Sequence, residues 1–278
     1  MGLVQPAPIR NESIIGAQVC SHSGEFSPEV FDLELPSRGV SFQFLRKYRS
    51  ALSHEIRPLG RGWTFTYAKR LEQDGADILY HDGFGRIHRF SSSPNGGFVS
   101  PDGFYAVLHI GGDQFLLKQR FGDLYRLERP DAGGRLLTIE DRNGNALRFV
   151  HGDQSIGVID PYGREILIRL EHDRVVEVKD HTGRGWQYRY DENSCLVEVV
   201  QPPIHGVADR PRVRYGYDRD YRLVSIVDPK GQTLLRNTYD SQGRVRHQDH
   251  GDGTLDFEYE PIGGAMGGAR LYSPPESS

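Results

Sequence analysis

Residues 180–191 read Asp180-His181-Thr182-Gly183-Arg184-Gly185-Trp186-Gln187-Tyr188-Arg189-Tyr190-Asp191. The segment opens on an Asp-x-x-Gly signature, continues as an alternating aromatic run and closes on Tyr-Asp. The aspartate can accept hydrogen bonds from the turn backbone, and Gly183 can adopt the positive φ that a tight turn needs. Apolar and polar residues then alternate with a period of two, which is typical of a half-buried β-strand. The segment therefore predicts a turn followed by the second strand of a β-hairpin.

The same pattern recurs along the chain. The Asp-x-x-Gly signature returns at 141–144, 160–163 and 228–231, and an earlier copy lies at 82–85. Short alternating runs flank the later copies, so each unit is predicted to be a β-hairpin of about 20 residues. The glycines predicted to form the structural turns are Gly85, Gly144, Gly163, Gly183 and Gly231.

One such hairpin cannot bury its own apolar face, whereas hairpins stacked side by side share one. Strand twist forces so long a sheet to coil. The sequence therefore predicts an all-β fold in which repeated β-hairpins form a long coiled antiparallel sheet. The formal net charge of −4 over 278 residues, with mixed signs throughout, does not indicate a nucleic-acid partner. No apolar run reaches the length of a membrane-spanning helix, and the first residues are not typical of a signal peptide, so we expect no membrane insertion.

A second recurring feature is a Tyr-Asp pair at the end of the second strand. It stands at Tyr190-Asp191, Tyr217-Asp218 and Tyr239-Asp240. The clearest unit is 220–231, which runs into 238–244. Together with the patterns at 24–26, 32–40, 44–50, 59–63 and 82–86, these pairs resemble the Rhs (YD-repeat) family. The likeness extends over roughly residues 19–260, as the opening domain of an Rhs core followed by about six hairpin repeats.

Rhs cores coil a long β-sheet into a hollow shell that encloses a C-terminal toxin, often delivered by a type VI secretion system. The resemblance therefore implies a non-catalytic structural segment of such a shell. Its partners would be the rest of the shell, the enclosed toxin and the secretion machinery. It would reside in the bacterial cytoplasm before export and then be secreted. The letters of the family's Asp-Pro-x-Gly cleavage motif occur at 160–163 and 228–231, but both copies lie inside ordinary repeats and are predicted to be turns.

Two other function classes stay open. A carbohydrate- or cell-surface-binding module would be favoured by exposed aromatic residues, but Trp63 and Trp186 each alternate in phase with further aromatics, as in a packed sheet face. An enzyme is the third class. No nucleophile elbow, Cys–His signature or phosphate-binding loop is present, so we predict no enzyme, no catalytic residue and no cofactor. The polar cluster at 247–254 lacks the ligand spacing of a zinc or calcium site, and we predict a solvated turn without metal.

The predicted organisation has four parts: an amino-terminal arm at 1–18, an opening β domain at 19–130, the repeats at 131–260 and a Gly/Pro/Ser-rich tail at 261–278. The last strand would lie at an open edge of the sheet, with one apolar face formed by Leu255, Phe257 and Tyr259. Unpaired edges are normally occupied. We therefore expect a partner strand there, from the next repeat of a longer protein, from a second chain or from self-association.

Overall fold

The computed structural model describes residues 18–120, 122–251, 253–259 and 269–272. These residues form 25 β-strands and two three-residue 3-10 helices, and they contain no α-helix. The helices are η2 (Ser50–Leu52) and η3 (Pro130–Ala132). In the described part of the chain, no helix is long and apolar enough to cross a membrane. The predicted all-β class is confirmed.

The main sheet has sixteen strands within the described residues, each hydrogen-bonded to the strand before and after it in the sequence. We call it the repeat sheet. Every pairing in it is antiparallel, so it is one continuous meander of hairpins. Its strands are β10 (Ala106–Gly111), β11 (Gln114–Gln119), β12 (Leu124–Glu128), β13 (Leu136–Glu140), β14 (Ala146–His151), β15 (Ser155–Ile159), β16 (Glu165–Glu171), β17 (Arg174–Lys179), β18 (Gly185–Tyr190), β19 (Leu196–Val200), β20 (Arg212–Tyr217), β21 (Leu223–Val227), β22 (Thr233–Tyr239), β23 (Val245–Asp249), β24 (Thr254–Tyr259) and β25 (Ala269–Tyr272).

Three smaller sheets precede the repeat sheet. The first has three strands, and we call it the amino-terminal sheet: β1 (Glu29–Leu35), β2 (Phe42–Tyr48) and β5 (Trp63–Phe65). A two-stranded hairpin is inserted before its last strand: β3 (Ile56–Arg57) and β4 (Gly60–Arg61). A four-stranded sheet follows: β6 (Lys69–Asp74), β7 (Asp77–Asp82), β8 (Ile87–Ser92) and β9 (Phe98–Val99).

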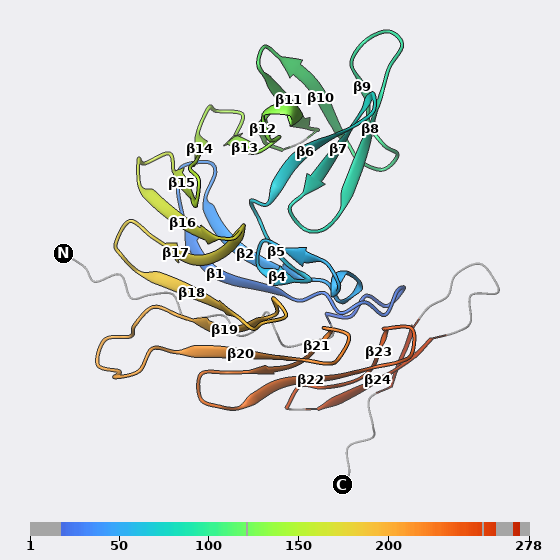
Figure 1. The fold of residues 1–278 in the computed structure, drawn as a ribbon, viewed down its shortest axis with the longest axis vertical. Helices are drawn as coiled ribbons and strands as arrows, with labels where there is room; N and C mark the ends of the chain where they lie inside the picture. Colours follow the sequence, from blue (N-terminus) through green and yellow to red (C-terminus); the bar gives the residue numbers. More distant parts are fainter. Residues whose placement is uncertain (1–17, 121, 252, 260–268, 273–278) are drawn as a thin grey trace.

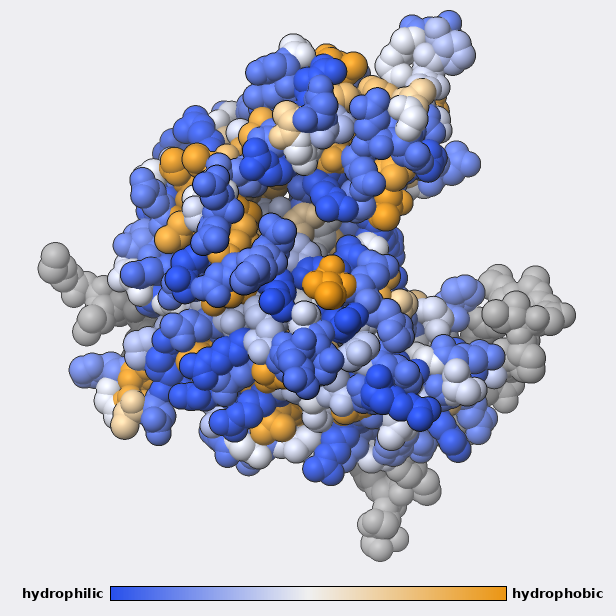
Figure 2. Space-filling model, in the orientation of Figure 1, coloured by the Kyte–Doolittle hydropathy of each residue, from blue (hydrophilic) through white to orange (hydrophobic). Residues whose placement is uncertain are grey.

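The repeat sheet curls as an open arc, and β1, β2 and β5 lie inside the arc (Figure 1). Alternate residues of each repeat strand point inward, so the buried side chains of the repeats and of the amino-terminal sheet form one continuous apolar cluster. Phe42, Phe44, Tyr48 and Trp63 are all fully buried in it. The face of the molecule in Figure 2 is largely hydrophilic, with small separate apolar patches. The core therefore lies between the repeat sheet and the amino-terminal sheet, and the four-stranded sheet adds Leu71, Ile78, Tyr80 and Phe90 to it.

The five turn glycines predicted from the sequence all have positive φ, between +76° and +88°. At Gly144, Gly163 and Gly231, a Cβ atom would meet nothing within 4 Å. Glycine is needed at these three positions for the backbone conformation alone, and not to make room for a neighbour.

Two boundaries differ from those expected. The repeat sheet begins at β10, so the expected domain boundary at 130/131 falls inside it. The strand carrying Leu255, Phe257 and Tyr259 is not an edge, because β25 pairs with β24 along residues 269–272. The prediction of an open edge at this strand is therefore wrong, and the region expected as a tail contributes the strand β25. The expected arm at 1–17 and the rest of the tail lie outside the described residues.

Candidate functional site at the interface of the two sheets

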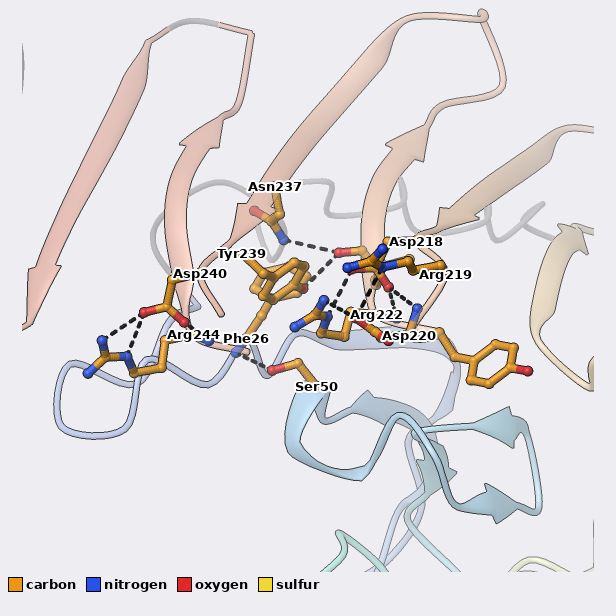
Figure 3. Close-up of polar contacts among 12 residues, drawn as sticks. Phe26, Ser50, Asp218, Arg219, Asp220, Arg222, Asn237, Tyr239, Asp240 and Arg244 are labelled. Atoms are coloured by element: carbon orange, nitrogen blue, oxygen red, sulfur yellow. Dashed lines mark hydrogen bonds and ion pairs between the residues drawn. The ribbon is translucent and has the colours of Figure 1, made fainter. Parts of the chain in front are cut away.

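The Tyr-Asp pairs lie at one end of the repeat strands, where each aspartate organises a turn. Figure 3 shows the turns of Asp218 and Asp240. Asp240 Oδ1 accepts hydrogen bonds from the backbone N–H groups of Gln242 and Arg244, both at 2.9 Å. Its Oδ2 accepts from Arg244 Nε at 2.8 Å. Asp218 contacts the backbone and Nε of Arg222 in the same way. One carboxylate thus fixes the turn backbone and orients an arginine four residues later.

The Asp-x-x-Gly turns at the opposite strand ends use the same contacts. Burial by itself would raise the pKa of Asp180, but hydrogen bonds from Thr182 and Arg184 outweigh burial and hold the pKa below its ordinary value. Asp160 behaves likewise, with Arg164 as its main partner, and its pKa is also lowered. These carboxylates are therefore ionised parts of the fold at neutral pH.

A β-bulge follows four of the turns at the Tyr-Asp end. The pairing register shifts by one residue at Tyr190, Tyr217 and Tyr239, and also at Leu170. A bulge leaves backbone polar groups without partners in the neighbouring strand, and buried groups of this kind need partners elsewhere. Each strand after such a turn has its first buried residue at or next to its start. These residues are Val175, Leu196, Leu223 and Val245, and all four are fully buried.

Tyrosine hydroxyls satisfy the carbonyls of these four residues. Each tyrosine lies on the strand that comes next in the sequence. Its hydroxyl donates to the backbone carbonyl of the first buried residue on the strand before its own. The pairs are Tyr190 to Val175 (2.5 Å), Tyr217 to Leu196 (2.7 Å), Tyr239 to Leu223 (2.8 Å) and Tyr259 to Val245 (2.6 Å). His151 Nε2 contacts the carbonyl of Leu136 at 2.7 Å in the corresponding place of an earlier unit. We call this row of contacts the bulge ladder.

Residues 18–65, which contain the amino-terminal sheet and which we call the amino-terminal unit, provide acceptors for the backbone N–H groups of three residues of the bulge ladder. Val175 N–H donates to the carbonyl of Pro58 at 2.8 Å. Leu223 N–H donates to the hydroxyl of Tyr48 at 3.0 Å, and Val245 N–H to the carbonyl of Gly24 at 2.9 Å. Gly24 has a φ of +69°, and a Cβ there would come within 2.5 Å of the side chain of Arg244. The two sheets therefore meet through backbone groups that the bulges expose.

A buried ion pair lies at the centre of this interface. Arg46, on β2, is 1% exposed and contacts both carboxylate oxygens of Asp32, at 2.5 and 2.9 Å. Its guanidinium also donates to the hydroxyl of Tyr215 at 3.1 Å, and Tyr188 donates to Asp32 at 2.7 Å. The guanidinium carbon lies 5.2 Å from the ring centre of Trp63, within cation–π range. Asp32 and Arg46 come from the amino-terminal sheet, and both tyrosines come from the repeat sheet.

The electrostatics of the pair favour its charged form. Burial alone would lower the pKa of Arg46, but the neighbouring Asp32 outweighs burial and the pKa lies well above its ordinary value. Burial, and then the charge of Asp32, raise the pKa of Tyr188, so its hydroxyl stays protonated and can donate. Arg46 Nη1 has no hydrogen-bond partner among the described residues. Removing either partner of the pair would leave an isolated buried charge, which is strongly destabilising.

The structure brings the predicted Tyr-Asp residues together in one row, with Tyr259 as a further member. Four of the predicted turn glycines lie at the opposite end of the repeat strands, and the fifth lies in the turn between β7 and β8; the four are Gly144, Gly163, Gly183 and Gly231, and the fifth is Gly85. Trp63 and Trp186 are buried at 0% and 7% exposure, as the packed-face interpretation expects. In the cluster at 247–254, His247 contacts Asp256 at 2.7 Å. The described residues hold no group of three or more His, Cys, Asp or Glu that could bind a metal.

Sequence reasoning missed the ion pair, although the sequence contained a signal for one partner. Arg46 is in phase with Phe42, Phe44 and Tyr48 on β2, so a charge stands where the alternation requires an inward side chain. Asp32 is harder to find. It lies at a register shift between Phe31 and Leu33, which the alternating pattern does not reveal.

The chain is similar in sequence to several known proteins. Residues 16–90 match the family described as Domain of unknown function (DUF6531). The chain is 26% identical over 274 residues to tRNA nuclease WapA of Bacillus subtilis (strain 168), covering 82% of this chain and 12% of that protein. It is 28% identical over 255 residues to Probable deoxyribonuclease RhsA of Dickeya dadantii (strain 3937), covering 86% of this chain and 17% of that protein.

Among solved structures, the crystal structure of TcdB2-TccC3-Cdc42 matches at 15% identity with a TM-score of 0.36, covering 89% of this chain and 14% of that one. The chain thus spans less than a fifth of each of these three proteins. The sequence comparisons confirm the resemblance to Rhs/YD-repeat proteins.

Proposed function

We propose that this Rhs-type chain is a non-catalytic segment of a toxin-enclosing shell, and that its amino-terminal unit closes one end of that shell. One observation carries the proposal: the concave face of the repeat sheet is filled by the amino-terminal sheet (Figure 1). In a coiled shell the concave face is the interior wall. A wall whose inner surface is already covered leaves no room for cargo, so this segment would form an end of the shell.

The nature of the interface supports this role. The buried Arg46–Asp32 pair is hydrogen-bonded to Tyr215 and Tyr188 of the repeat sheet, and three backbone N–H groups at the bulges donate to the amino-terminal residues. This is a buried interface, unlike the small polar contacts between mobile domains. A toxin, the remaining shell and export by a type VI secretion system belong to the proposal on the strength of the Rhs resemblance. So does the expected route from the bacterial cytoplasm to the outside of the cell.

The nuclease activities in the names of the two relatives do not transfer to this segment in our proposal. Because the alignments cover only 12% and 17% of those proteins, we infer that the activities reside outside the aligned part. The purified chain should leave tRNA and DNA intact over prolonged incubation. Cleavage that co-purifies with the chain and is lost in a folded point variant would overturn the non-catalytic assignment.

The end-closing role calls for a structural experiment. Cryo-electron microscopy of the longest polypeptide encoded by the gene should show this segment at a closed end, with the amino-terminal sheet between the repeats and any enclosed density. Enclosed density directly against the inner faces of β18–β22, with the amino-terminal sheet displaced, would contradict the proposal. The second candidate, a carbohydrate-binding module, loses the support of the two buried tryptophans. Among the described residues, the exposed aromatic side chains are Phe31, Tyr105 and Tyr162.

A further inference from the structure

A pocket of about 400 Å³ opens at the first strand of the repeat sheet, far along the sheet from the bulge ladder. A volume of this size suits a small ligand. The residues that argue for its chemistry lie on β10, on the loop before it, and on β11 and the residue after it. They are Phe104, Tyr105, Val107, Lys118, Gln119 and Arg120.

The pocket lies on the outer face of the sheet. Tyr105 and Val107 alternate with Ala106 and Leu108, whose side chains are buried in the core. The register pairs Val107 with Lys118, and the N–H of Arg120 donates to the carbonyl of Tyr105 at 3.0 Å. Directly opposed residues of two antiparallel strands share a face. The two cationic side chains therefore stand beside Tyr105 and Val107 on the solvent side.

The side chains of the pocket combine a flat apolar surface with positive charge. Tyr105 is 72% exposed and Val107 is 48% exposed, so both present apolar surface to the solvent. The guanidinium carbon of Arg120 lies 5.8 Å from the ring centre of Tyr105. None of the described residues that line the pocket is Asp or Glu. The charged side chains among the described lining residues, Lys118 and Arg120, are both cationic, which favours an anionic ligand.

We propose that this pocket binds an acidic sugar, a uronic acid unit of a surface polysaccharide. The apolar face of a pyranose ring packs on an exposed tyrosine ring, and a carboxylate pairs with guanidinium and ammonium groups. Tyr105 supplies the stacking surface, while Arg120 and Lys118 receive the carboxylate. The carboxylates of an acidic peptide could also pair with the two cations, but they would not stack on the ring of Tyr105. The proposal does not depend on the shell function.

The test is a titration of the full chain with trigalacturonate, followed through the tyrosine ring signals in NMR spectra. We expect saturable shifts at Tyr105, with a dissociation constant in the range of about 0.1–1 mM. Tyr105→Ala and Arg120→Gln should each weaken binding by about tenfold or more. Both side chains are exposed, so both variants should keep the thermal stability of the parent. Tyr162→Ala, which removes an equally exposed tyrosine in a distant turn, is the matched control and should bind as the parent does.

Three results would overturn the proposal. Equal affinity for uncharged trigalactose would show that the carboxylate is not recognised. Equal affinity for a triglutamate peptide would mean that the site takes any small polyanion or peptide, and not a sugar. No shift at Tyr105 up to about 10 mM trigalacturonate would mean that the pocket does not bind this class of ligand.

Discussion

Replacing Tyr217 by Phe tests the bulge ladder at the tyrosine whose hydroxyl makes two buried hydrogen bonds. The Tyr217 hydroxyl donates to the carbonyl of Leu196 at 2.7 Å and accepts from Trp63 Nε1 at 2.9 Å. Leu196 and Trp63 are both fully buried, so water cannot replace the lost oxygen without rearrangement of the core. The variant would leave two buried polar groups without partners, at about 1–3 kcal/mol each. We therefore expect the free energy of unfolding to fall by about 2–6 kcal/mol.

The predicted loss of stability can be checked against two other Tyr→Phe variants in the same assay. Tyr190→Phe removes only the donor to Val175, and should lose about half as much, roughly 1–3 kcal/mol. Tyr162→Phe removes an exposed hydroxyl and should stay within about 0.5 kcal/mol of the parent. Urea denaturation followed by tryptophan fluorescence measures all three, provided that the m-value is unchanged. If Tyr217→Phe lost no more stability than Tyr162→Phe, the ladder would not be a stabilising contact.

Three further predictions concern the ion pair, a turn glycine and the turn aspartates. Asp32→Ala should lower the free energy of unfolding by about 3–5 kcal/mol because it isolates the Arg46 charge, and adding Arg46→Met should restore part of the loss in urea denaturation; additive losses would argue against the pair. Gly144→Val should cost about 1–2 kcal/mol through left-handed backbone strain, and Gly144→Asn less, because Asn tolerates that conformation; thermal melts that rank the two variants equally would contradict this reason. Because the pKa values of Asp160 and Asp180 are lowered by folding, their contribution is complete above the unfolded pKa, near 4, and is lost as the pH falls through the folded values. Denaturation midpoints measured from pH 7 to pH 3 should therefore decline below about pH 4, and less steeply in Asp180→Asn; an unchanged decline in that variant would exclude Asp180 as a contributor.

The repeat sheet could be predicted because its determinants are local. Each hairpin carries its own turn aspartate and glycine, and each strand carries its own alternation, so the pattern around Asp180 and Gly183 specifies a unit without reference to distant residues. The Tyr-Asp pairs were recognised as a signature. Their physical role was not, because the hydroxyl of Tyr217 acts on a carbonyl 21 residues away.

The parts that could not be predicted depend on long-range contacts. Arg46 and Tyr215 are 169 residues apart in the chain, and no local pattern indicates that they meet. The pairing of β24 with β25 was missed because the strand at 269–272 lies within a Gly- and Pro-rich region, whose composition is typical of a linker. At residues 269–272, the chance to pair with β24 determines the local structure more than the Gly- and Pro-rich composition does.

Native-state hydrogen exchange at three backbone amides tests the central claim most directly, namely that the amino-terminal unit is docked into the repeat sheet. The amides of Val175, Leu223 and Val245 are freed by the bulges and donate to acceptors of the amino-terminal unit. If the unit is docked, these amides should exchange as slowly as the amides paired within the core strands, through global unfolding. If they exchange quickly while the strand-paired amides on either side stay protected, the amino-terminal unit does not close the concave face, and the account is wrong.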